Sequence, residues 1–287
     1  MKTFYVDGHF VPENQAVIPV DDLAILRGLG VCDLMRTYQG RPFFLEEHIQ
    51  RLEHSAGEIG LTLPWACRDM EAVVIETLEK NPGIDEANIR IIITGGSSPD
   101  FMTPMGKPRL LVLITPIPRL PDTWYTQGVK VITVMSERDI PEAKSISYIP
   151  ATLALQKAHQ QGAIEALFYD RRGFVREGTT SNLFAFIDGR LVTPEDGVLK
   201  GITRKVILAL AAPLFEIELR AIRLEELLSA QEVFITGTNK GIVPVVTIDN
   251  NSIGNGMPGK RTGTIIQALD RHAAGFKDLR PWEEGRA

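Results

Sequence analysis

The sequence contains few of the features that mark secreted, membrane-spanning or metal-stabilised proteins. Its two cysteines, Cys32 and Cys67, are too few for a disulfide framework, and they form no zinc-ligand spacing with the histidines. We therefore expect no structural metal. No run of about 18 apolar residues occurs, and the start MKTFYVDGHF lacks the apolar stretch of a signal peptide. These absences predict a cytoplasmic protein that does not enter a membrane.

An excess of positive charge is also missing. The formal net charge is −5, so there is no basic field that could neutralise a nucleic-acid backbone, and we expect no nucleic-acid partner. The pair Gly28 and Gly30 lacks the third glycine and the following helix of a dinucleotide fingerprint. Apolar residues, in contrast, make up 44% of the 287 residues, which is enough for a substantial core and favours two domains.

The first half of the chain alternates between strand and helix patterns. Asp7-Gly8 lies between two short apolar runs and predicts a hairpin. Residues 45–59 and 70–78 have the apolar spacing of amphipathic helices, while 89–93 and 110–114 are typical of buried strands.

A segment rich in proline, residues 116–123, interrupts this pattern. Its prolines can continue neither a helix nor a central strand, so we place a domain boundary there. The prediction is a two-domain α/β fold of the α+β type, with a small N-terminal α/β domain at 1–115 and a larger mixed α/β domain at 124–287. In the second domain we expect strands at 129–134, 166–169, 183–187 and 232–236, and helices at 149–161 and 203–214.

Three sequence motifs of the second domain are the most specific features of the chain. They are Lys144-Ser-Ile-Ser-Tyr148, Glu177-Gly-Thr-Thr-Ser-Asn-Leu-Phe184 and Val198-Leu-Lys-Gly-Ile-Thr-Arg204. Each residue taken alone has an ordinary interpretation, because a single lysine or glutamate is usually solvated. In this order and at this separation, however, the stretches resemble the class IV aminotransferases, and the resemblance extends over essentially the whole chain.

The resemblance implies pyridoxal 5'-phosphate as cofactor and assigns roles to three residues. Lys144 matches the lysine that forms a Schiff base with the cofactor and then moves a proton between substrate and cofactor carbons. Glu177 matches the carboxylate that faces the pyridine nitrogen and keeps it protonated. Tyr148 resembles a tyrosine that approaches the ring hydroxyl in branched-chain enzymes, although it stands one residue closer to the lysine than expected.

The cofactor's phosphate requires several donors. Gly201-Ile202-Thr203 opens a predicted helix, whose free amides suit an anion. The resemblance adds Arg51, in a His-x-x-Arg pattern, and Thr238, in a late Gly-Thr turn. Without it, Arg51 would be a helix-surface arginine.

The residues that hold the substrate depart from the family patterns. Where D-amino-acid aminotransferases carry a tyrosine, an arginine and a histidine, this chain has Cys32, Asp100 and Met102, and an aspartate repels a carboxylate. The remaining candidates are Arg90, which alternation places on the strand face opposite Ile89 and Ile91, together with Asn239 and Lys240. Lys240 adds a cation that could favour a diacid, and Arg90 is equally compatible with a solvated position.

The leading hypothesis is a homodimeric transaminase that moves an amino group from a branched-chain or other apolar L-amino acid to a 2-oxo acid. The dimer is implied by the family alone. The alternatives are an aminodeoxychorismate lyase that releases pyruvate, a D-amino-acid or amine transaminase, and a cofactor-binding protein without activity. The last alternative fits poorly, because both Lys144 and Glu177 are present.

Overall fold

The computed structural model describes residues 1–276. They form two compact units, one made of Met1–Ile117 together with 270–276, and the other of Pro118–Leu269. The division falls inside the proline-rich segment 116–123. The sequence predicted that residues 124–287 form one domain. This range stays a prediction, and its last part, 277–287, lies outside the described residues.

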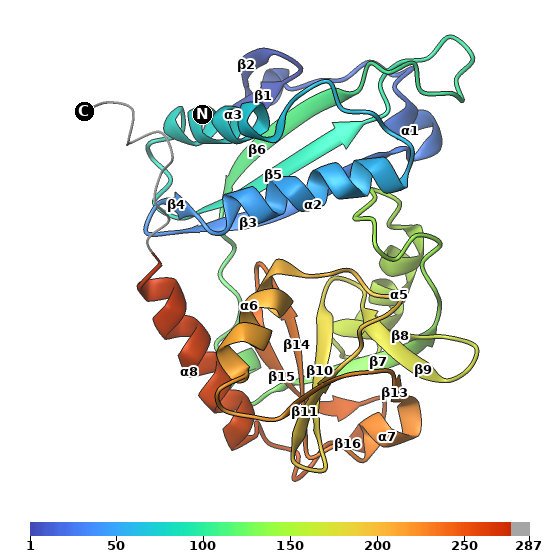
Figure 1. Ribbon diagram of the computed structural model, residues 1–287, viewed down its shortest axis with the longest axis vertical. Coiled ribbons are helices and arrows are strands. Elements are labelled where there is room, and N and C mark those ends of the chain that lie inside the picture. Colours follow the sequence, from blue (N-terminus) through green and yellow to red (C-terminus); the bar gives the residue numbers. More distant parts are fainter. Residues whose placement is uncertain (277–287) are drawn as a thin grey trace. The chain divides into compact units, whose positions relative to one another are not determined.

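The first unit is built on a six-stranded sheet with the strand order β2-β1-β6-β5-β3-β4. Helices α2 and α3 pack side by side on one face of this sheet (Figure 1). The strands are β1 Thr3–Val6, β2 His9–Pro12, β3 Gly30–Tyr38, β4 Arg41–Pro42, β5 Ala87–Thr94 and β6 Arg109–Pro116. The helices are η1 Glu13–Gln15, α1 Leu23–Arg27, α2 Leu45–Glu58 and α3 Cys67–Glu79.

Alternation along β5 explains how this sheet presents two different faces. Ile89, Ile91 and Ile93 are fully buried in the core shared with α2 and α3, whereas Arg90 is exposed on the opposite face. The face predicted for Arg90 is therefore confirmed. The predicted hairpin is confirmed as well, since β1 and β2 pair in antiparallel fashion across Asp7 and Gly8, both of which have positive φ.

The second unit is built on a ten-stranded sheet with the order β12-β11-β10-β14-β15-β7-β8-β9-β13, and β16 pairs with β15. Strands β15, β7 and β8 run parallel to one another, and most of the other pairs are antiparallel. The strands are β7 Val129–Met135, β8 Glu165–Tyr169, β9 Phe174–Gly178, β10 Asn182–Ile187, β11 Arg190–Thr193, β12 Ile217–Leu219, β13 Ile222–Arg223, β14 Glu232–Gly237, β15 Gly241–Ile248 and β16 Asn251–Ser252.

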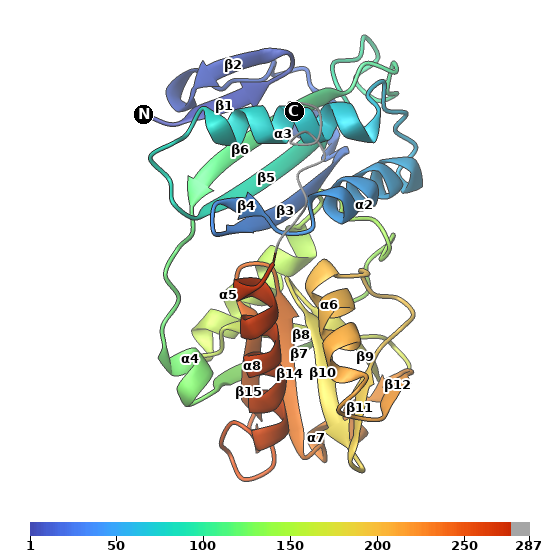
Figure 2. The same ribbon diagram turned by 60° about the vertical axis from the view of Figure 1, so that its left-hand side comes forward.

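The helices of the second unit cover different parts of this sheet. Ala151, Ala154 and Ala158 of α5 pack on Ile132 and Phe168, while the opposite side chains of the same strands enter the main core. Figure 2 shows α6 beside β10 and β14. The bounds are α4 Thr123–Thr126, α5 Ile149–Gln160, α6 Ile202–Ala211, α7 Leu224–Leu228 and α8 Lys260–Ala274, whose residues from Asp270 belong to the first unit.

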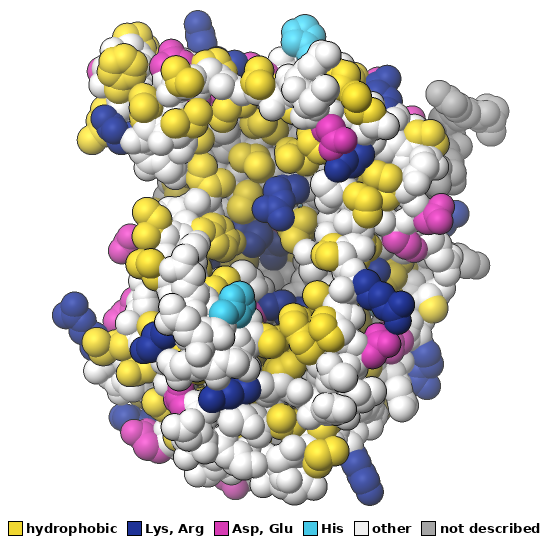
Figure 3. Space-filling view, turned by 180° about the vertical axis from the view of Figure 1, so that it is seen from behind, with side chains coloured by type: hydrophobic (Ala, Val, Ile, Leu, Met, Phe, Trp, Pro, Cys, Tyr) yellow, Lys and Arg dark blue, Asp and Glu magenta, His cyan; other side chains and the backbone are white. Residues whose placement is uncertain are grey.

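The expected elements all occur, with one helix shorter than expected. The prediction for 203–214 was wrong at its end, because α6 stops at Ala211 and the next residues form a turn in which Leu214 and Phe215 both donate to the Ala211 carbonyl. Within the described residues, no helix is long and apolar enough to cross a membrane. On the face seen in Figure 3, basic and acidic side chains are interspersed over the surface of each unit.

Candidate active site

Lys144 lies in the loop between β7 and α5 of the second unit. Its ammonium donates a hydrogen bond to the Tyr148 hydroxyl at 3.1 Å, and Tyr148 occupies the N-cap position of α5. Ala143, immediately before the lysine, is fully buried, so the backbone that carries Lys144 is anchored in the core. Both residues that the sequence singled out in this loop are therefore brought together at its end.

Glu177 lies near the end of β9 and is almost fully buried. One carboxylate oxygen accepts from Arg138 at 2.9 Å, and the other accepts from the Leu199 amide at 3.0 Å. Burial raises the pKa of Glu177, and the positive charges of Arg138 and Lys144 and the Leu199 hydrogen bond offset that effect only in part. The site therefore holds an acid whose negative charge is not fully compensated by the protein.

Arg138 connects these two parts of the site, and nothing in the sequence singled it out. Besides its bond to Glu177, its guanidinium donates to the carbonyl of Pro141 at 3.1 Å and to that of Ala143. It thereby ties the loop that carries Lys144 to the end of β9. No local pattern predicts this role, because Glu177 follows Arg138 by 39 positions.

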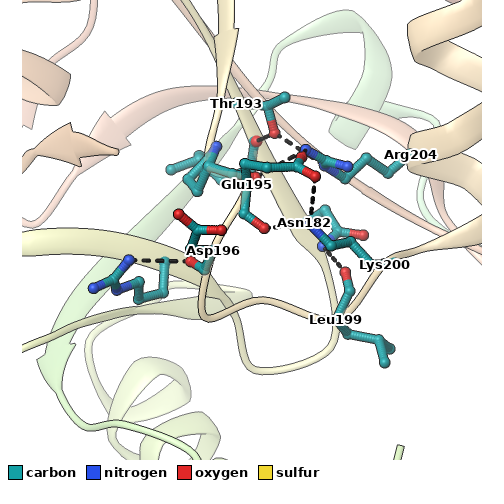
Figure 4. Close-up of polar contacts among 10 residues, drawn as sticks. Asn182, Thr193, Glu195, Asp196, Leu199, Lys200 and Arg204 are labelled. Atoms are coloured by element: carbon teal, nitrogen blue, oxygen red, sulfur yellow. Dashed lines mark hydrogen bonds and ion pairs between the residues drawn. The ribbon is translucent and has the colours of Figure 1, made fainter. Parts of the chain in front are cut away.

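Leu199, whose amide donates to Glu177, also connects that acid to the N-terminus of α6, which begins after Gly201. Asn182 at the start of β10 donates to the Leu199 carbonyl at 2.8 Å, as Figure 4 shows. Gly201 is the N-cap of α6, no side chain among the described residues caps the helix, and a Cβ at Gly201 would meet the Asn182 amide oxygen at 2.0 Å. Ile202 and Thr203 therefore begin a helix whose first amides are left for an anion.

A buried arginine fixes α6 in place behind that terminus. Arg204 donates to Glu195 at 2.6 Å and to the Pro194 carbonyl at 2.9 Å, and its guanidinium also lies near the Thr193 hydroxyl (Figure 4). These bonds join the first turn of α6 to the end of β11 and the segment after it. The position of the helix start is therefore set from two sides, by Arg204 and by the Asn182–Leu199 contact.

The turn between β14 and β15 contains Thr238, Asn239 and Lys240. The Lys240 amide donates to the Gly237 carbonyl at 3.2 Å, and the Tyr125 hydroxyl donates to the Lys240 carbonyl at 3.1 Å. Three side-chain oxygens in this neighbourhood are buried without a hydrogen-bond partner among the described residues, namely Ser181 Oγ, Thr236 Oγ1 and Asn239 Oδ1. Unpartnered polar atoms of this kind are expected where a polar ligand binds.

Lys240 is already engaged within the protein. Its ammonium forms an ion pair with the fully buried Glu165 and donates to the Thr180 hydroxyl at 3.0 Å. The sequence had offered this cation for a substrate carboxylate. The structure records an internal carboxylate as its partner.

Arg51 belongs to the first unit, where it is held by a buried acid. Its Nε donates to one oxygen of Asp33 at 2.9 Å and its Nη2 to the other at 2.7 Å, while the His48 ring contacts the second oxygen at 2.7 Å. Burial opposes the charge of Asp33, but Arg51 and His48 outweigh it and lower its pKa. Asp33 was not predicted, although it points to the α2 face of β3, where an acid requires a partner.

Arg90, the substrate candidate of the first unit, lies on the same face of the sheet as Cys32. Cys32 pairs with Ile92 and Leu34 with Arg90, so Cys32 and the exposed Arg90 share the face of the sheet opposite α2 and α3. Asp100 accepts from Ser98, Met102 and Thr103 at 2.7 to 2.9 Å, and these donors lower its pKa. The Asp100 carboxylate therefore stabilises the loop to which it belongs through hydrogen bonds with neighbouring residues.

The family model for amino-transferase class IV matches residues 30–248. The chain belongs to the class IV aminotransferases. It is a transaminase, as its relatives are named, and class IV aminotransferases are pyridoxal-phosphate enzymes.

The relatives of this class IV aminotransferase are named for two different kinds of substrate. A protein of Methanocaldococcus jannaschii, provisionally named as a branched-chain-amino-acid aminotransferase, is 38% identical over 286 residues, with 96% of each chain covered. A D-alanine aminotransferase of Bacillus licheniformis is 32% identical over 275 residues, covering 94% of this chain and 96% of that protein.

Solved structures agree with the fold. The branched-chain amino acid aminotransferase of Escherichia coli is similar with a TM-score of 0.90 and 28% identity, covering 98% of both chains. A second branched-chain enzyme, from T.th. and solved with pyridoxamine 5'-phosphate, has a TM-score of 0.89 at 28% identity, covering 99% of this chain and 97% of that one. The two-domain mixed α/β fold predicted for this class IV aminotransferase is therefore confirmed.

Proposed function

We propose that this class IV aminotransferase uses pyridoxal 5'-phosphate to transfer the amino group of an apolar, branched-chain L-amino acid to a 2-oxo acid. One observation carries the proposal. Within a single unit, Arg138 joins the Lys144 loop to the buried Glu177, and Leu199 joins Glu177 to the uncapped N-terminus of α6. A lysine, a buried acid and an anion site are the three groups that this cofactor needs.

The donor set fits the cofactor. The uncapped α6 terminus at Ile202 and Thr203 suits the phosphate, and the turn at Thr238 lies among unpartnered buried oxygens. The family resemblance assigns Arg51 of the first unit to the phosphate as well, and in the structure Asp33 fixes its guanidinium through Nε and Nη2. When bound, pyridoxal phosphate supplies an electron sink for the substrate's α-carbon.

The chain's own residues then have distinct tasks. Glu177 holds a proton at the cofactor's ring nitrogen, a task suited to a buried carboxylate whose charge Arg138 only partly offsets. Lys144 Nζ would accept the proton from the substrate's α-carbon and pass it to the cofactor's carbon on the same face. Tyr148, hydrogen-bonded to Lys144 at 3.1 Å, orients that amine beside the cofactor's ring hydroxyl.

One relative and a solved structure that match this chain support branched-chain substrates. The M. jannaschii relative and the E. coli structure carry branched-chain names. Arg90 and the Asn239 turn are our candidates for the substrate carboxylate. The relatives named D-alanine aminotransferase support a D-amino-acid enzyme as the second candidate. Against it, Asp100 is an acid that is occupied in its own loop.

Three finer statements belong to the same proposal. The enzyme acts as a homodimer, as the family resemblance implies, and in the cytoplasm, as the sequence predicts. Its partners are a small amino acid and a 2-oxo acid. A lyase that releases pyruvate from aminodeoxychorismate would use the same Lys144 and Glu177 and is kept as an outcome of the test.

The test is an absorbance spectrum of the protein loaded with pyridoxal phosphate, followed by single additions of L- and D-amino acids. Conversion of the lysine-bound cofactor band to the aminated-cofactor band by L-leucine, L-isoleucine or L-valine is the expected result. Conversion by D-alanine alone would transfer the assignment to the D-amino-acid class. An unchanged band with every amino acid, together with pyruvate release from aminodeoxychorismate, would establish the lyase.

Lys144→Ala supplies the control for the cofactor assignment. We expect the band of the lysine-bound cofactor to disappear and turnover to fall by at least about a thousandfold, within the range for a positioned acid-base group. Lys157→Ala removes an exposed lysine of α5 and should change neither. A Lys144→Ala protein that still shows the lysine-bound band would contradict the assignment of Lys144.

A further inference from the structure

Glu165, the first residue of β8, is completely buried, yet it accepts hydrogen bonds from several directions. The Thr179 hydroxyl donates to it at 2.6 Å, the Thr180 amide at 2.6 Å and the Thr180 hydroxyl at 3.1 Å. Lys240 supplies the opposite charge through its ion pair. A buried acid with this many donors is fixed in one geometry.

The four residues connect two turns that are far apart in the sequence. Thr179 and Thr180 lie between β9 and β10, whereas Lys240 lies between β14 and β15, and Lys240 follows Glu165 by 75 positions. Lys240 also donates directly to the Thr180 hydroxyl at 3.0 Å. We call this set, Glu165, Thr179, Thr180 and Lys240, the buried clamp.

Both turns border residues that the proposed function uses. The first turn leads into Asn182, which supports the start of α6 through the Leu199 carbonyl (Figure 4). The second turn holds Thr238 and Asn239 at its tip, and its remaining anchors are the Gly237 and Tyr125 hydrogen bonds to Lys240. The clamp therefore ties the turn that carries Thr238 and Asn239 to β8 and to the turn before β10.

The clamp also limits what Lys240 can do. Its side chain is only 15% exposed, and its charge is neutralised by an internal carboxylate. Burial opposes ionisation of Glu165, but Lys240, Thr179 and Thr180 outweigh it and keep the pKa of that carboxyl below its usual value. A second carboxylate on a substrate would therefore meet an ion pair in place of a free cation.

We propose that Lys240 is a positioning residue whose ion pair with Glu165 sets the Thr238–Asn239 turn for the carboxylate common to all substrates, and that it does not select diacids. The inference rests on the proposed function, since it names what the turn binds. It predicts that weakening the clamp affects ligands with one carboxylate and ligands with two by the same factor. A lysine that read a second carboxylate would affect the diacid alone.

The experiment measures binding of two carboxylates that lack an amino group, 4-methylpentanoate and glutarate, to the cofactor-loaded protein by absorbance titration. In Lys240→Met we expect both dissociation constants to rise by about tenfold or more, the effect of a misplaced hydrogen-bonding group. A rise for glutarate alone would overturn the proposal, and so would two unchanged constants. Lys80→Met, which removes an exposed lysine paired with Glu76, is the control.

Glu165→Gln provides a second test of whether Lys240 positions the turn or reads a second substrate carboxylate. It leaves the Lys240 cation in place and removes its partner, so a lysine that reads substrate charge would bind glutarate as tightly as before or more tightly. Our proposal expects weaker binding of both ligands by a similar factor in Glu165→Gln and in Lys240→Met. Lys240→Arg keeps the positive charge and should retain most of the affinity for both ligands. Retained affinity in this variant would show that the loss in Lys240→Met comes from the missing charge and not from misfolding.

Hydrogen exchange of the protein without cofactor provides a readout that needs neither binding nor turnover. Amides of residues 178–182 and 237–241 should exchange faster in Lys240→Met, while those of α5 stay unchanged. Unaltered exchange in both turns would overturn the clamp. Because this measurement does not depend on the cofactor, failure of the proposed function, seen as a wild-type protein inert to every amino acid, remains distinguishable from failure of the clamp.

Discussion

Two buried glutamates on the neighbouring strands β8 and β9 differ in the direction of their pKa shifts. Glu165 is fully buried and Glu177 nearly so. Burial raises the pKa of both, but in Glu165 the ion pair with Lys240 and the threonine donors reverse the shift. In Glu177, Arg138 and one amide do not, and its pKa stays raised.

The difference lies in how completely the protein neutralises each charge. Lys240, which pairs with Glu165, is itself largely enclosed, whereas Arg138, which pairs with Glu177, is 28% exposed and divides its donors among two carbonyls as well. A fully satisfied acid rigidifies the fold. An acid left partly uncompensated has remaining capacity for a cationic ligand, as a protonated ring nitrogen would be.

Breaking the satisfied pair should have the largest effect on stability. Lys240→Met leaves Glu165 as an unpaired buried charge, so we expect the free energy of unfolding to fall by about 3–5 kcal/mol near neutral pH. Urea unfolding measures it. The loss should shrink on acidification, because protonating Glu165 removes the unpaired charge. Lys80→Met, at an exposed pair, should cost at most about 1 kcal/mol, and an equal loss in both variants would contradict the comparison.

The sequence predicted much of the fold because its signals are local. The hairpin at Asp7-Gly8, the helix from Leu45 and the start of a helix after Gly201 each depend on residues a few positions apart. Lys144 and Glu177 could be proposed only through the order of three motifs, since each alone is an ordinary surface residue type.

The residues that sequence reasoning missed act over long separations. Arg138 pairs with Glu177 across 39 positions and Lys240 with Glu165 across 75. Asp33 meets Arg51 only because β3 packs against α2. Such pairs depend on tertiary contacts that carry no periodicity, so Lys240 looked like a free cation. One sequence cannot reveal which charges neutralise each other.

Changing the uncompensated acid should have the next largest effect, and on activity. Glu177→Gln keeps the shape of the side chain but cannot hold a proton at the ring nitrogen by charge. We expect kcat to fall by about a hundredfold, as when one preorganised electrostatic group is removed. Steady-state kinetics with the best amino donor measures this change. A Glu177→Gln enzyme with wild-type kcat would place the acid outside the site.

The arginine beside Glu177 offers a smaller and pH-dependent effect. Arg138→Met removes a charge that lowers the pKa of Glu177, so the ionised form is lost at a higher pH than in the wild type. We expect the acid limb of the activity–pH profile to move to higher pH, so that activity falls toward the acid end and changes little at the alkaline end. Arg176→Met is a control, because Arg176 lies on β9 beside Glu177 but pairs with Asp170 at 2.6 Å. An acid limb that shifts equally in both variants would contradict the role of Arg138.

The smallest effect has opposite signs at the two glutamates. The folded-state pKa of Glu177 lies above the unfolded value, so its ionisation destabilises the protein without cofactor as pH rises from about 4.5. Glu177→Gln removes that cost and should stabilise this form at pH 8 by on the order of 1 kcal/mol, or ~2–4 °C in Tm. Glu165 has a lowered folded-state pKa, so its contribution to stability is present above the unfolded value and lost as pH falls. Glu165→Gln should therefore lower the Tm at pH 8, and thermal scans in which both variants shift in the same direction would show that the protein treats the two acids alike.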